Sequence, residues 1–286
     1  MTPFFSIIVV CFNAGDKLIS TVKSILCQTC GDYEIIVKDA GSKDGSTQKL
    51  PSDARIRLYA GKDAGIYDGM NQALSHAGGR YVYFLNCGDS LHDPQVLEKV
   101  KAAIQSAETP GSVGAAQGAG TPEGAGNPEG GMIFYGDVIE MRTGQRVAAN
   151  PQMDHFAMYR YLPCHQACFY DRALFLERQF NIELKVRADY EHFLWCIIRK
   201  KAGAAVMPLV IADYEGGGYS ESEEGRRLSG KEHREIAKEY FTASERFLYR
   251  LYLIVSLQPL REKLANGRYT AAVYDRIKNA VYERRR

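Results

Sequence analysis

The first hundred residues alternate between short, continuous apolar runs and longer amphipathic segments. The run FFSIIVVCF at residues 4–12 is rich in β-branched side chains, which is typical of a strand buried on both faces. Residues 13–29 carry apolar side chains every three or four positions, a spacing that predicts a helix. By the same criteria, strands are predicted at 4–12, 33–39, 55–60 and 80–86, and helices at 13–29, 66–77 and 93–107. This order predicts an α/β fold, a Rossmann-like, mostly parallel sheet with helices on both faces.

The pattern is interrupted at residues 109–131, which are almost entirely Gly, Ala, Pro, Thr and Glu. Such a segment has little apolar surface to bury, so we expect a disordered surface insertion. Periodic segments then resume, with strands at 132–141, 146–150 and 204–215, a short strand and a helix within 162–180, and a helix at 188–203. We therefore expect one body over residues 1–215 and a basic, amphipathic helical tail over residues 216–286.

The composition suits a globular protein. The chain has 286 residues, 45% of them hydrophobic, which is enough for one large domain or two small ones. A net charge of +2 gives no sign of a nucleic-acid partner. The charge is uneven, because residues 245–286 hold ten Lys or Arg against four acids, and the rest of the chain is therefore acidic. A basic tail on an acidic body suggests that the tail meets something anionic.

The seven cysteines lie scattered in apolar segments, and no basic signal sequence precedes the first strand. Free thiols in a reducing, cytoplasmic compartment are the expectation. Cys27 and Cys30 form one Cys-x-x-Cys, but a zinc site needs a second pair. No run reaches the roughly 20 apolar residues that a membrane-spanning helix requires.

Polar side chains follow each of the first four predicted strands, at the edge where ligands bind in such sheets. Carboxylates appear after three of these strands, and a cation or a polyhydroxy ligand would offset their repulsion. For any single loop, ordinary turn chemistry remains the alternative. The residues concerned are Asn13 after the first strand, Asp39, Ser42 and Asp44 after the second, Lys62, Asp63 and Gly65 after the third, and Asn86 to Asp89 after the fourth.

The chain resembles family 2 glycosyltransferases of the GT-A fold over about residues 4–100 and 162–215. The resemblance rests on SIIVVCFN, on SILCQTCGDYEIIVKDAGSKDGS, on DAGIYDGMNQALSHAGGRYVYFLNCGD and on ADYEHFL. GIYDGMN and LNCGD are similar to the bacterial subgroup that builds exopolysaccharide, capsule or lipopolysaccharide. The resemblance implies inverting transfer of a sugar from a nucleotide sugar, expected to be a UDP-sugar, to a hydroxyl of a glycan or lipid-linked saccharide. It implies a nucleotide-sugar half at residues 4–100 and an acceptor half at residues 132–215.

The resemblance also implies roles for individual side chains. It places Asp39 against the uracil edge of the donor, where a carboxylate accepts well from an imide N–H. Gly41 and Ser42 would let the backbone approach the base. The full set of nucleotide-binding residues implied in this way is Asn13, Asp39, Gly41, Ser42, Asp63 and Asn71.

NCGD at residues 86–89 stands where the family has its Asp-x-Asp metal motif. Asn86 takes the first position, Gly88 replaces the usual extra carboxylate, and Asp89 is the carboxylate left. One carboxylate suffices for a divalent cation, Mn²⁺ or Mg²⁺, if the donor diphosphate supplies other ligands. This departure from the motif leaves the identity of the metal open. The alternative to a metal ligand is that Asp89 is an ordinary acid that precedes a helix.

Asp189, in ADYEHFL, matches the catalytic base of the family by position. At a helix start it is stabilised by the helix dipole and can accept the proton of the acceptor hydroxyl. Glu191 points elsewhere on that helix. His165, in PCHQACFYDR, is expected in an apolar strand, as a core residue or as a contact to acceptor or phosphate. Asn86, His165 and Glu191 are the candidates for acceptor or phosphate contacts.

Two alternatives stay open at this point. The chain could be a catalytically silent nucleotide-sugar or glycan-binding module, although Asp189 beside Asp39 and Asp89 favours an enzyme. In the tail, residues 246–257 and 271–286 suit interfacial helices, in peripheral contact with the cytoplasmic face of the inner membrane. They suit equally well packing against the body or against a second subunit in an oligomer.

Overall fold

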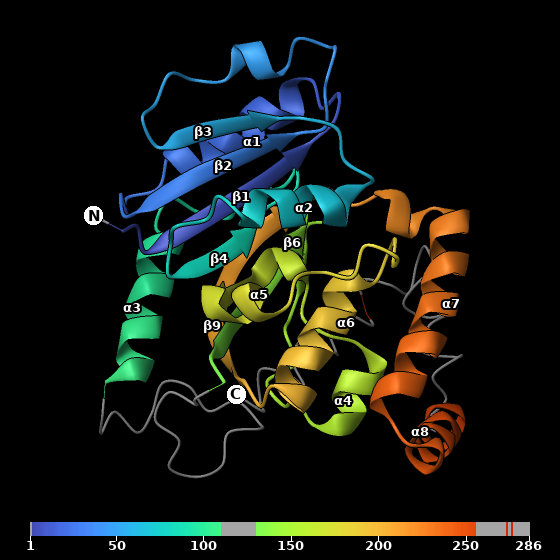
Figure 1. The fold of residues 1–286 in the computed structure, drawn as a ribbon. Coiled ribbons are helices and arrows are strands. Elements are labelled where there is room, and N and C mark those ends of the chain that lie inside the picture. The colour runs from blue at the N-terminus through green and yellow to red at the C-terminus, as the bar shows by residue number, and fades with distance from the viewer. Residues whose placement is uncertain (1, 110–129, 256–272, 274–275, 277–286) are drawn as a thin grey trace.

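The computed structural model describes residues 2–109 and 130–255, with residues 273 and 276. One sheet runs through this part of the chain (Figure 1). Its strands are β1 (Phe5–Cys11), β2 (Tyr33–Asp39), β3 (Ile56–Ala60), β4 (Tyr81–Phe84), β5 (Ser90–Leu91), β6 (Met132–Glu140), β7 (Gln145–Val147), β8 (Cys168–Asp171) and β9 (Gly203–Tyr214). They follow the order β3-β2-β1-β4-β8-β6-β9-β5, and β7 pairs with β6.

The long strand pairings are parallel. β1 pairs in parallel with β2 and β4, β2 with β3, and β6 with β9. The short strand β8 runs antiparallel between β4 and β6 and thereby joins the two parallel parts. The predicted mostly parallel α/β sheet is confirmed.

Helices cover both faces of the sheet, as predicted. α1 and α3 contribute to the hydrophobic cluster on one face, whereas α2 and α4 to α7 contribute to the cluster on the other. Figure 1 shows α2, α5 and α6 in front of the sheet. The helices are α1 (Asp16–Leu26), α2 (Ile66–Leu74), α3 (Val96–Glu108), α4 (His155–Arg160), α5 (Arg172–Glu177), α6 (Ala188–Leu194), α7 (Glu223–Tyr240) and α8 (Ala243–Val255), with short 3-10 turns η1 (Thr47–Lys49), η2 (His165–Ala167) and η4 (Tyr219–Glu221) and a π-helical turn η3 (Trp195–Arg199).

The position of the first strands explains their continuous apolar runs. Along β1, Ile8 belongs to one hydrophobic cluster, while Ile7 and Val9 belong to the other. All three are almost fully buried. Because neither face of β1 meets water, alternation with polar residues would cost stability, and fully burying each such side chain contributes about 1.5–3 kcal/mol.

Several element boundaries differ from the sequence prediction. The helix predicted at 188–203 is α-helical only to Leu194, continues as the π-helical turn η3 to Arg199, and is followed by β9 from Gly203. The helix predicted at 93–107 begins at Val96, since the carbonyls of Asp93 and Pro94 accept hydrogen bonds from residues 28 and 29. The helix α4 was not predicted. Its start is capped by the Asp154 side chain, which accepts from the backbone N–H of Ala157.

The structure describes only part of the predicted tail and little of the predicted insertion. α7 and α8 confirm that the tail begins as helix, whereas the predicted insertion and the segment 271–286 fall almost entirely outside the described residues. None of the seven cysteines forms a disulfide. Within the described ranges, no helix is long and apolar enough to cross a membrane.

Candidate active site

The ends of three neighbouring strands bring the predicted nucleotide loops together. In register, Asp39 of β2 lies opposite Cys11 of β1 and Ala60 of β3. The loops that follow these strands therefore leave the same edge of the sheet. The contacts of Asn13 with Ser42 and of Lys38 with Asp63 bring the polar residues of these loops close together.

Asp39 organises the loop that follows it. Its carboxylate accepts from the backbone N–H groups of Gly41 (3.1 Å) and Ser42 (2.9 Å) and from the Ser42 hydroxyl. The Ser42 Oγ accepts from the backbone N–H of Asn13 (2.8 Å), and the Asn13 Oδ1 accepts from that of Lys43 (2.9 Å). Asp39 is only 3% exposed. These bonds show that Asp39 shapes the loop that follows it.

Asp63 and Asn71 lie in different surroundings. Asp63 forms an ion pair with the buried Lys38 of β2 (3.4 Å) and accepts from the backbone N–H of Gly65 (3.2 Å), at the same edge as Asp39. The Asn71 amide donates to the Phe180 carbonyl (2.8 Å) and accepts from the Phe180 N–H (3.0 Å). Asn71 thus ties α2 to the segment before α6, and its amide does not face the nucleotide loops as the sequence suggested.

Asp89 is a buried carboxylate just beyond the end of β4. Its Oδ1 accepts from the backbone N–H of Glu215 (2.9 Å), and its Oδ2 accepts from the Gln166 side chain (3.1 Å). Burial raises the pKa of Asp89 above its ordinary value, although both hydrogen bonds favour the ionised form. A positive charge beside it would offset that cost.

A second carboxylate occupies the place that the incomplete Asp-x-Asp motif leaves free. Glu215 follows β9, and a Cβ atom on Gly88 would lie 2.6 Å from the Glu215 Oε2. Gly88 also has φ +102°, which favours glycine. Glu215 pairs with Lys17 at 2.5 Å. The sequence reasoning missed Glu215, although the rule that found Asp39 and Asp89, a polar residue directly after a strand, applies to β9 as well.

These side chains fit a cation that shares its ligands with a bound molecule. In the described part of the chain, no three His, Cys, Asp or Glu side chains gather as a complete metal site. Asp89 and Glu215 nevertheless offer adjacent carboxylates, and Mg²⁺ is commonly held by one or two carboxylates plus substrate phosphates. Mn²⁺ accepts the same oxygen ligands.

Asp189 lies in the first turn of α6, 27% exposed. Its Oδ1 accepts from the Tyr67 hydroxyl (2.9 Å) and from the backbone N–H of Tyr190 (2.9 Å), and its Oδ2 lies 3.3 Å from the His165 Nδ1. Burial alone would raise the pKa of Asp189, but His165, Tyr67 and the Tyr190 N–H lower it below its ordinary value. The carboxylate is therefore ionised at neutral pH and able to accept a proton.

His165 connects this carboxylate to the end of β4. Its Nε2 lies 2.9 Å from the Asn86 Nδ2, so Asn86, His165, Asp189 and Tyr67 form one series, linked by hydrogen bonds and, between His165 and Asp189, by the 3.3 Å contact. The sequence suggested a core histidine in a strand as one alternative. His165 instead lies in η2, before β8, with its side chain 23% exposed.

Glu191 is not part of this series. It is 2% exposed and receives hydrogen bonds from Arg178 (2.7 Å) and from the Tyr240 hydroxyl. Burial raises the pKa of Glu191 despite these partners. The structure therefore makes Glu191 a buried structural acid between α6 and α7, and the expected contact to acceptor or phosphate is not supported.

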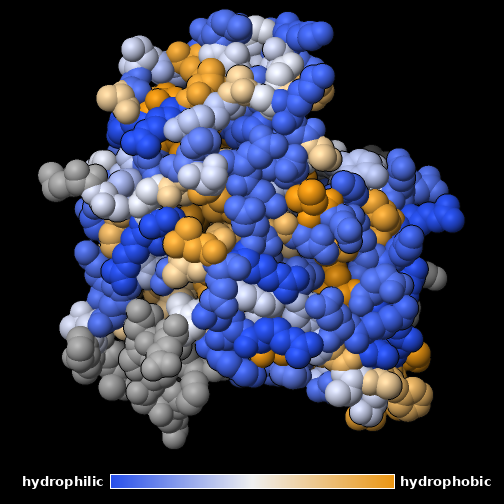
Figure 2. Space-filling model, in the orientation of Figure 1, coloured by the Kyte–Doolittle hydropathy of each residue, from blue (hydrophilic) through white to orange (hydrophobic). Residues whose placement is uncertain are grey.

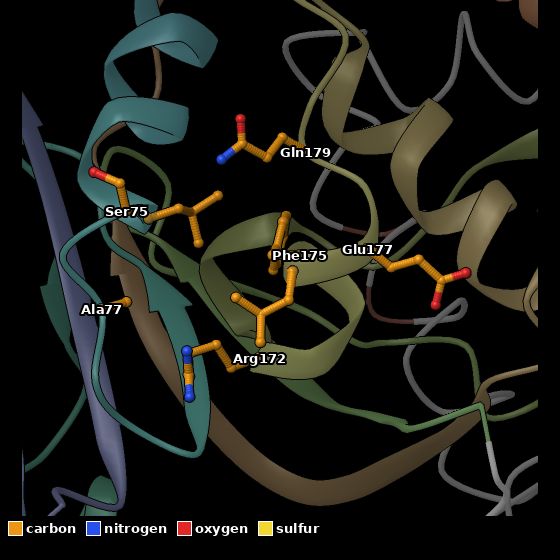
Figure 3. Close-up of a pocket in the computed structure, with 8 residues that line it drawn as sticks. Ser75, Ala77, Arg172, Phe175, Glu177 and Gln179 are labelled. Carbon is orange, nitrogen blue, oxygen red and sulfur yellow. The ribbon is translucent and has the colours of Figure 1, made fainter.

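Two hollows bear on where a ligand binds. A hollow of about 210 Å³ lies between the end of α2 and α5, and Ser75, Arg172 and Gln179 are among the residues that line it (Figure 3). No predicted site residue lines it, and it is smaller than the range of about 300–1,000 Å³ usual for small ligands. A hollow of about 400 Å³ borders Gly88 and Glu215. The second hollow is continuous with the candidate site, and its other lining residues are Asp16, Lys17, Ser20, Met141 and Arg142.

Comparison with known sequences gives matches over most of the chain. Residues 6–166 match the family described as Glycosyl transferase family 2. A PGL/p-HBAD biosynthesis glycosyltransferase of Mycobacterium bovis is 32% identical over 225 residues, which are 76% of this chain and 79% of that protein. The putative teichuronic acid biosynthesis glycosyltransferase TuaG of Bacillus subtilis is 37% identical over 92 residues, 30% of this chain and 36% of that protein.

Solved structures share the fold at low sequence identity. S. aureus TarS in complex with UDP-GlcNAc has a TM-score of 0.57 and 18% identity, over 82% of this chain and 65% of that one. The mannosyltransferase PcManGT from Pyrobaculum calidifontis, in complex with GDP-Man and Mn²⁺, has a TM-score of 0.58 and 16% identity. That match covers 98% of this chain and 81% of the other, and both likenesses bear on the fold alone.

Proposed function

This chain belongs to glycosyl transferase family 2 and is a glycosyltransferase, and we propose that it transfers sugar from a UDP-sugar to a glycan or lipid-linked hydroxyl with inversion. The observation that carries the proposal is the series from Asn86 through His165 to Asp189. This series links an ionised, partly exposed carboxylate to the turn after β4, which carries the proposed cation ligand Asp89. The relatives are named as glycosyltransferases, which favours the enzyme over a silent binding module.

We assign the nucleoside part of the donor to the loops after β1, β2 and β3. Asn13, Asp39 and Ser42 hold two of these loops against each other, and Asp63 lies beside them. The solved structures of similar fold bind nucleotide sugars, UDP-GlcNAc in TarS and GDP-Man in PcManGT. On this proposal residues 4–100 form the nucleotide-sugar half and residues 132–215 form the acceptor half.

Asp89 and Glu215 would hold a divalent cation, Mn²⁺ or Mg²⁺, together with the donor diphosphate. When bound, such a cation supplies positive charge that stabilises the leaving diphosphate. The Mn²⁺ in the PcManGT complex supports this assignment. Lys17, paired with Glu215 in the structure, adds a further positive charge at the same place.

The proposed reaction needs one base. The acceptor oxygen attacks the anomeric carbon, its proton passes to the Asp189 carboxylate, and the bond from that carbon to the diphosphate oxygen breaks. Attack from the face opposite the leaving group inverts the anomeric centre. Asp189 suits this role because its carboxylate is ionised at neutral pH and its side chain is 27% exposed.

The donor and the stereochemistry are tested together. Purified enzyme is offered a panel of UDP-, GDP- and TDP-sugars, and release of free nucleoside diphosphate is measured with and without excess chelator. We expect release from a UDP-sugar that chelation abolishes, and a product of inverted anomeric configuration by NMR. Activity with GDP-sugars alone would contradict the uracil assignment, and a retained configuration would contradict the single-base mechanism.

For the acceptor, we propose a lipid-linked saccharide met at an anionic membrane surface. Two similar proteins are named for PGL/p-HBAD biosynthesis and, putatively, for teichuronic acid biosynthesis, which is consistent with an acceptor of this kind. Helix α8 presents an exposed apolar face near the lower right of Figure 2, and the sequence beyond it is basic. An apolar helix face with adjacent cations suits an anionic leaflet. The exposed side chains are Phe247, Leu248, Leu251, Tyr252, Ile254 and Val255.

Vesicle flotation tests this surface. The full chain should float with vesicles of phosphatidylglycerol and phosphatidylcholine but not with phosphatidylcholine alone, and the double variant Leu248→Glu, Leu251→Glu should stay at the bottom. Ile182→Glu, at an exposed apolar residue outside α8, is the matched control. Equal flotation of the double variant would contradict the proposal. The proposal would also be contradicted if neither protein bound vesicles and the wild type were a dimer that the two substitutions convert to a monomer.

A further inference from the structure

We propose that His165 is a positioning residue that holds the Asp189 carboxylate toward the acceptor, with Asn86 fixing the tautomer of its imidazole ring. The inference rests on the proposed role of Asp189 as the base. It replaces the contact to acceptor or phosphate that the sequence offered as one reading of His165.

The hydrogen-bond partners determine the tautomer. The amide nitrogen of Asn86, 2.9 Å from the His165 Nε2, carries two protons and no lone pair. The neutral ring therefore accepts at Nε2 and carries its proton on Nδ1. Nδ1 lies 3.3 Å from the Asp189 Oδ2, to which it donates. The backbone of Asn86 is held in place, because its main-chain carbonyl accepts from the backbone N–H of Asp89 (3.0 Å).

These bonds leave one oxygen of Asp189 for the reaction. Oδ1 accepts from both Tyr67 and the Tyr190 N–H, which occupy its two lone pairs. Oδ2 accepts from His165 and keeps one lone pair on a partly exposed side chain. The acceptor hydroxyl must then approach Oδ2, and His165 sets the direction of the remaining lone pair.

The same geometry argues against a phosphate contact. Both ring nitrogens of His165 already have partners, so neither is available to donate to a diphosphate oxygen.

The pair has titratable neighbours on every surrounding element. Hydrogen bonds or charge interactions link them to His165 or Asp189, directly or through Tyr67. They are Tyr67 of α2, Asp89 after β4, Cys168 and Tyr170 of β8, His192 of α6 and Glu232 of α7.

The pH profile of kcat/KM at saturating divalent cation tests the proposal, because its acid limb then reports the ionisation of the proposed base rather than that of Asp89. His165→Ala removes a bond that favours ionised Asp189. We expect the acid limb to move to higher pH by about one unit and the plateau to fall about tenfold, with donor affinity unchanged. His165→Asn, whose amide nitrogen can replace Nδ1, should return the limb toward that of the wild type.

The control is His155→Ala, which removes another histidine paired with a carboxylate, Glu245, at 3.3 Å on the surface. It should leave the profile unchanged. An unshifted limb in His165→Ala, or a loss of donor affinity instead, would overturn the inference. If Asp189→Asn keeps full activity, the proposed base is wrong, which is a separate failure from that of His165.

A second readout does not depend on activity. Long-range ¹H–¹⁵N NMR spectra of the intact protein distinguish a protonated Nδ1 from an unprotonated one. A protonated Nδ1 on His165 at pH 8 is the expected result. An Nδ1 without its proton, in a folded and active protein, would contradict the positioning role.

Discussion

Two acids of one helical turn have opposite environments. Asp189 is partly exposed and its pKa is lowered by His165, Tyr67 and a backbone N–H that outweigh burial, whereas burial raises the pKa of Glu191. The difference follows from direction, since residues two apart on a helix point to different sides. At the scale of single residues, hydrogen-bond partners and solvent exposure distinguish Asp189, the proposed base, from Glu191, a structural acid.

Glu191→Gln should destabilise the fold without stopping catalysis. The glutamine keeps the volume but loses the charge that faces Arg178 and Tyr240, so the free energy of unfolding should fall by about 1–3 kcal/mol. The measurement is urea denaturation beside kcat of the folded enzyme. Glu177→Gln, at an exposed carboxylate paired with Lys200, is the matched control and should change stability by under about 0.5 kcal/mol. A hundredfold loss of kcat at unchanged stability would show that Glu191 takes part in the reaction.

His192 makes stability depend on pH. It is fully buried, stacks on Phe175 and lies 2.9 Å from the Arg178 carbonyl, and burial lowers its pKa to about 4. In the unfolded chain His192 binds a proton below its ordinary pKa of 6.5, whereas in the folded chain it binds that proton only below a pKa of about 4. The contribution of neutral His192 to stability is therefore lost as the pH falls from about 6.5 to about 4.

His192→Gln isolates this contribution. Over that pH range, the slope of the unfolding free energy against pH should be shallower than in the wild type, by up to about 1.4 kcal/mol per unit. Urea denaturation at four or five pH values measures the slope. Identical slopes in both proteins would show that His192 does not titrate as described.

At the scale of elements, the end of β9 brings a second carboxylate, Glu215, to the turn after β4, which itself carries only Asp89. β9 pairs with both β5 and β6, and this brings Glu215 against Gly88, next to Asp89. A side chain at residue 88 would collide with the Glu215 carboxylate. The two carboxylates of the proposed cation site therefore come from residues 126 positions apart in the chain.

Glu215→Gln should weaken cation binding. In the presence of UDP, Mn²⁺ titrations followed by electron paramagnetic resonance should show affinity reduced about tenfold or more, because one of two carboxylates is lost. Asp89→Asn should reduce it further. Glu224→Gln, at an exposed acid in the first turn of α7, serves as the control. An affinity equal to that of the wild type would exclude Glu215 from the cation site.

The Gly- and Ala-rich insertion should be dispensable for folding. Replacing residues 110–129 with a short Gly-Ser link should leave the melting temperature within about 2 °C and donor binding intact, because this composition buries little apolar area. Gly130 and Gly131 must be kept. A Cβ on Gly130 would lie 2.6 Å from the Lys200 carbonyl, and Gly131 has φ +86°. A large fall in melting temperature would reveal a structural element within the segment.

Elements with strong local signals could be predicted, and elements made by tertiary contacts could not. β1 and β2 are continuous apolar runs because both faces are buried, which the pattern alone reveals. β5 has two residues and exists through its pairing with β9, so its own sequence carries no signal. The same holds for the site. Asp39 and Asp189 follow from motifs, whereas the bonds of Asn71 to Phe180 depend on a segment 109 residues away.

At the scale of the whole molecule, one edge of the sheet carries both halves of the proposed reaction. The loops after β1 to β3 belong to the first half, and Asp189 on α6 belongs to the second. β8 lies between β4 and β6 and joins the two halves within one sheet. The series from Asn86 to Asp189 spans the same junction, so that the proposed base is held at a fixed place relative to the turn after β4.

The most direct test of this account is the transfer rate of Asp189→Asn, measured at saturating donor whose affinity is determined by calorimetry on the same sample. Asn is nearly isosteric with Asp but cannot take the proton of the acceptor, so the account predicts wild-type donor affinity and a kcat about 10²–10⁴-fold lower. Transfer within a few-fold of the wild-type rate would contradict Asp189 as the base. Loss of donor binding would instead place Asp189 in the nucleotide site and contradict the proposed mechanism.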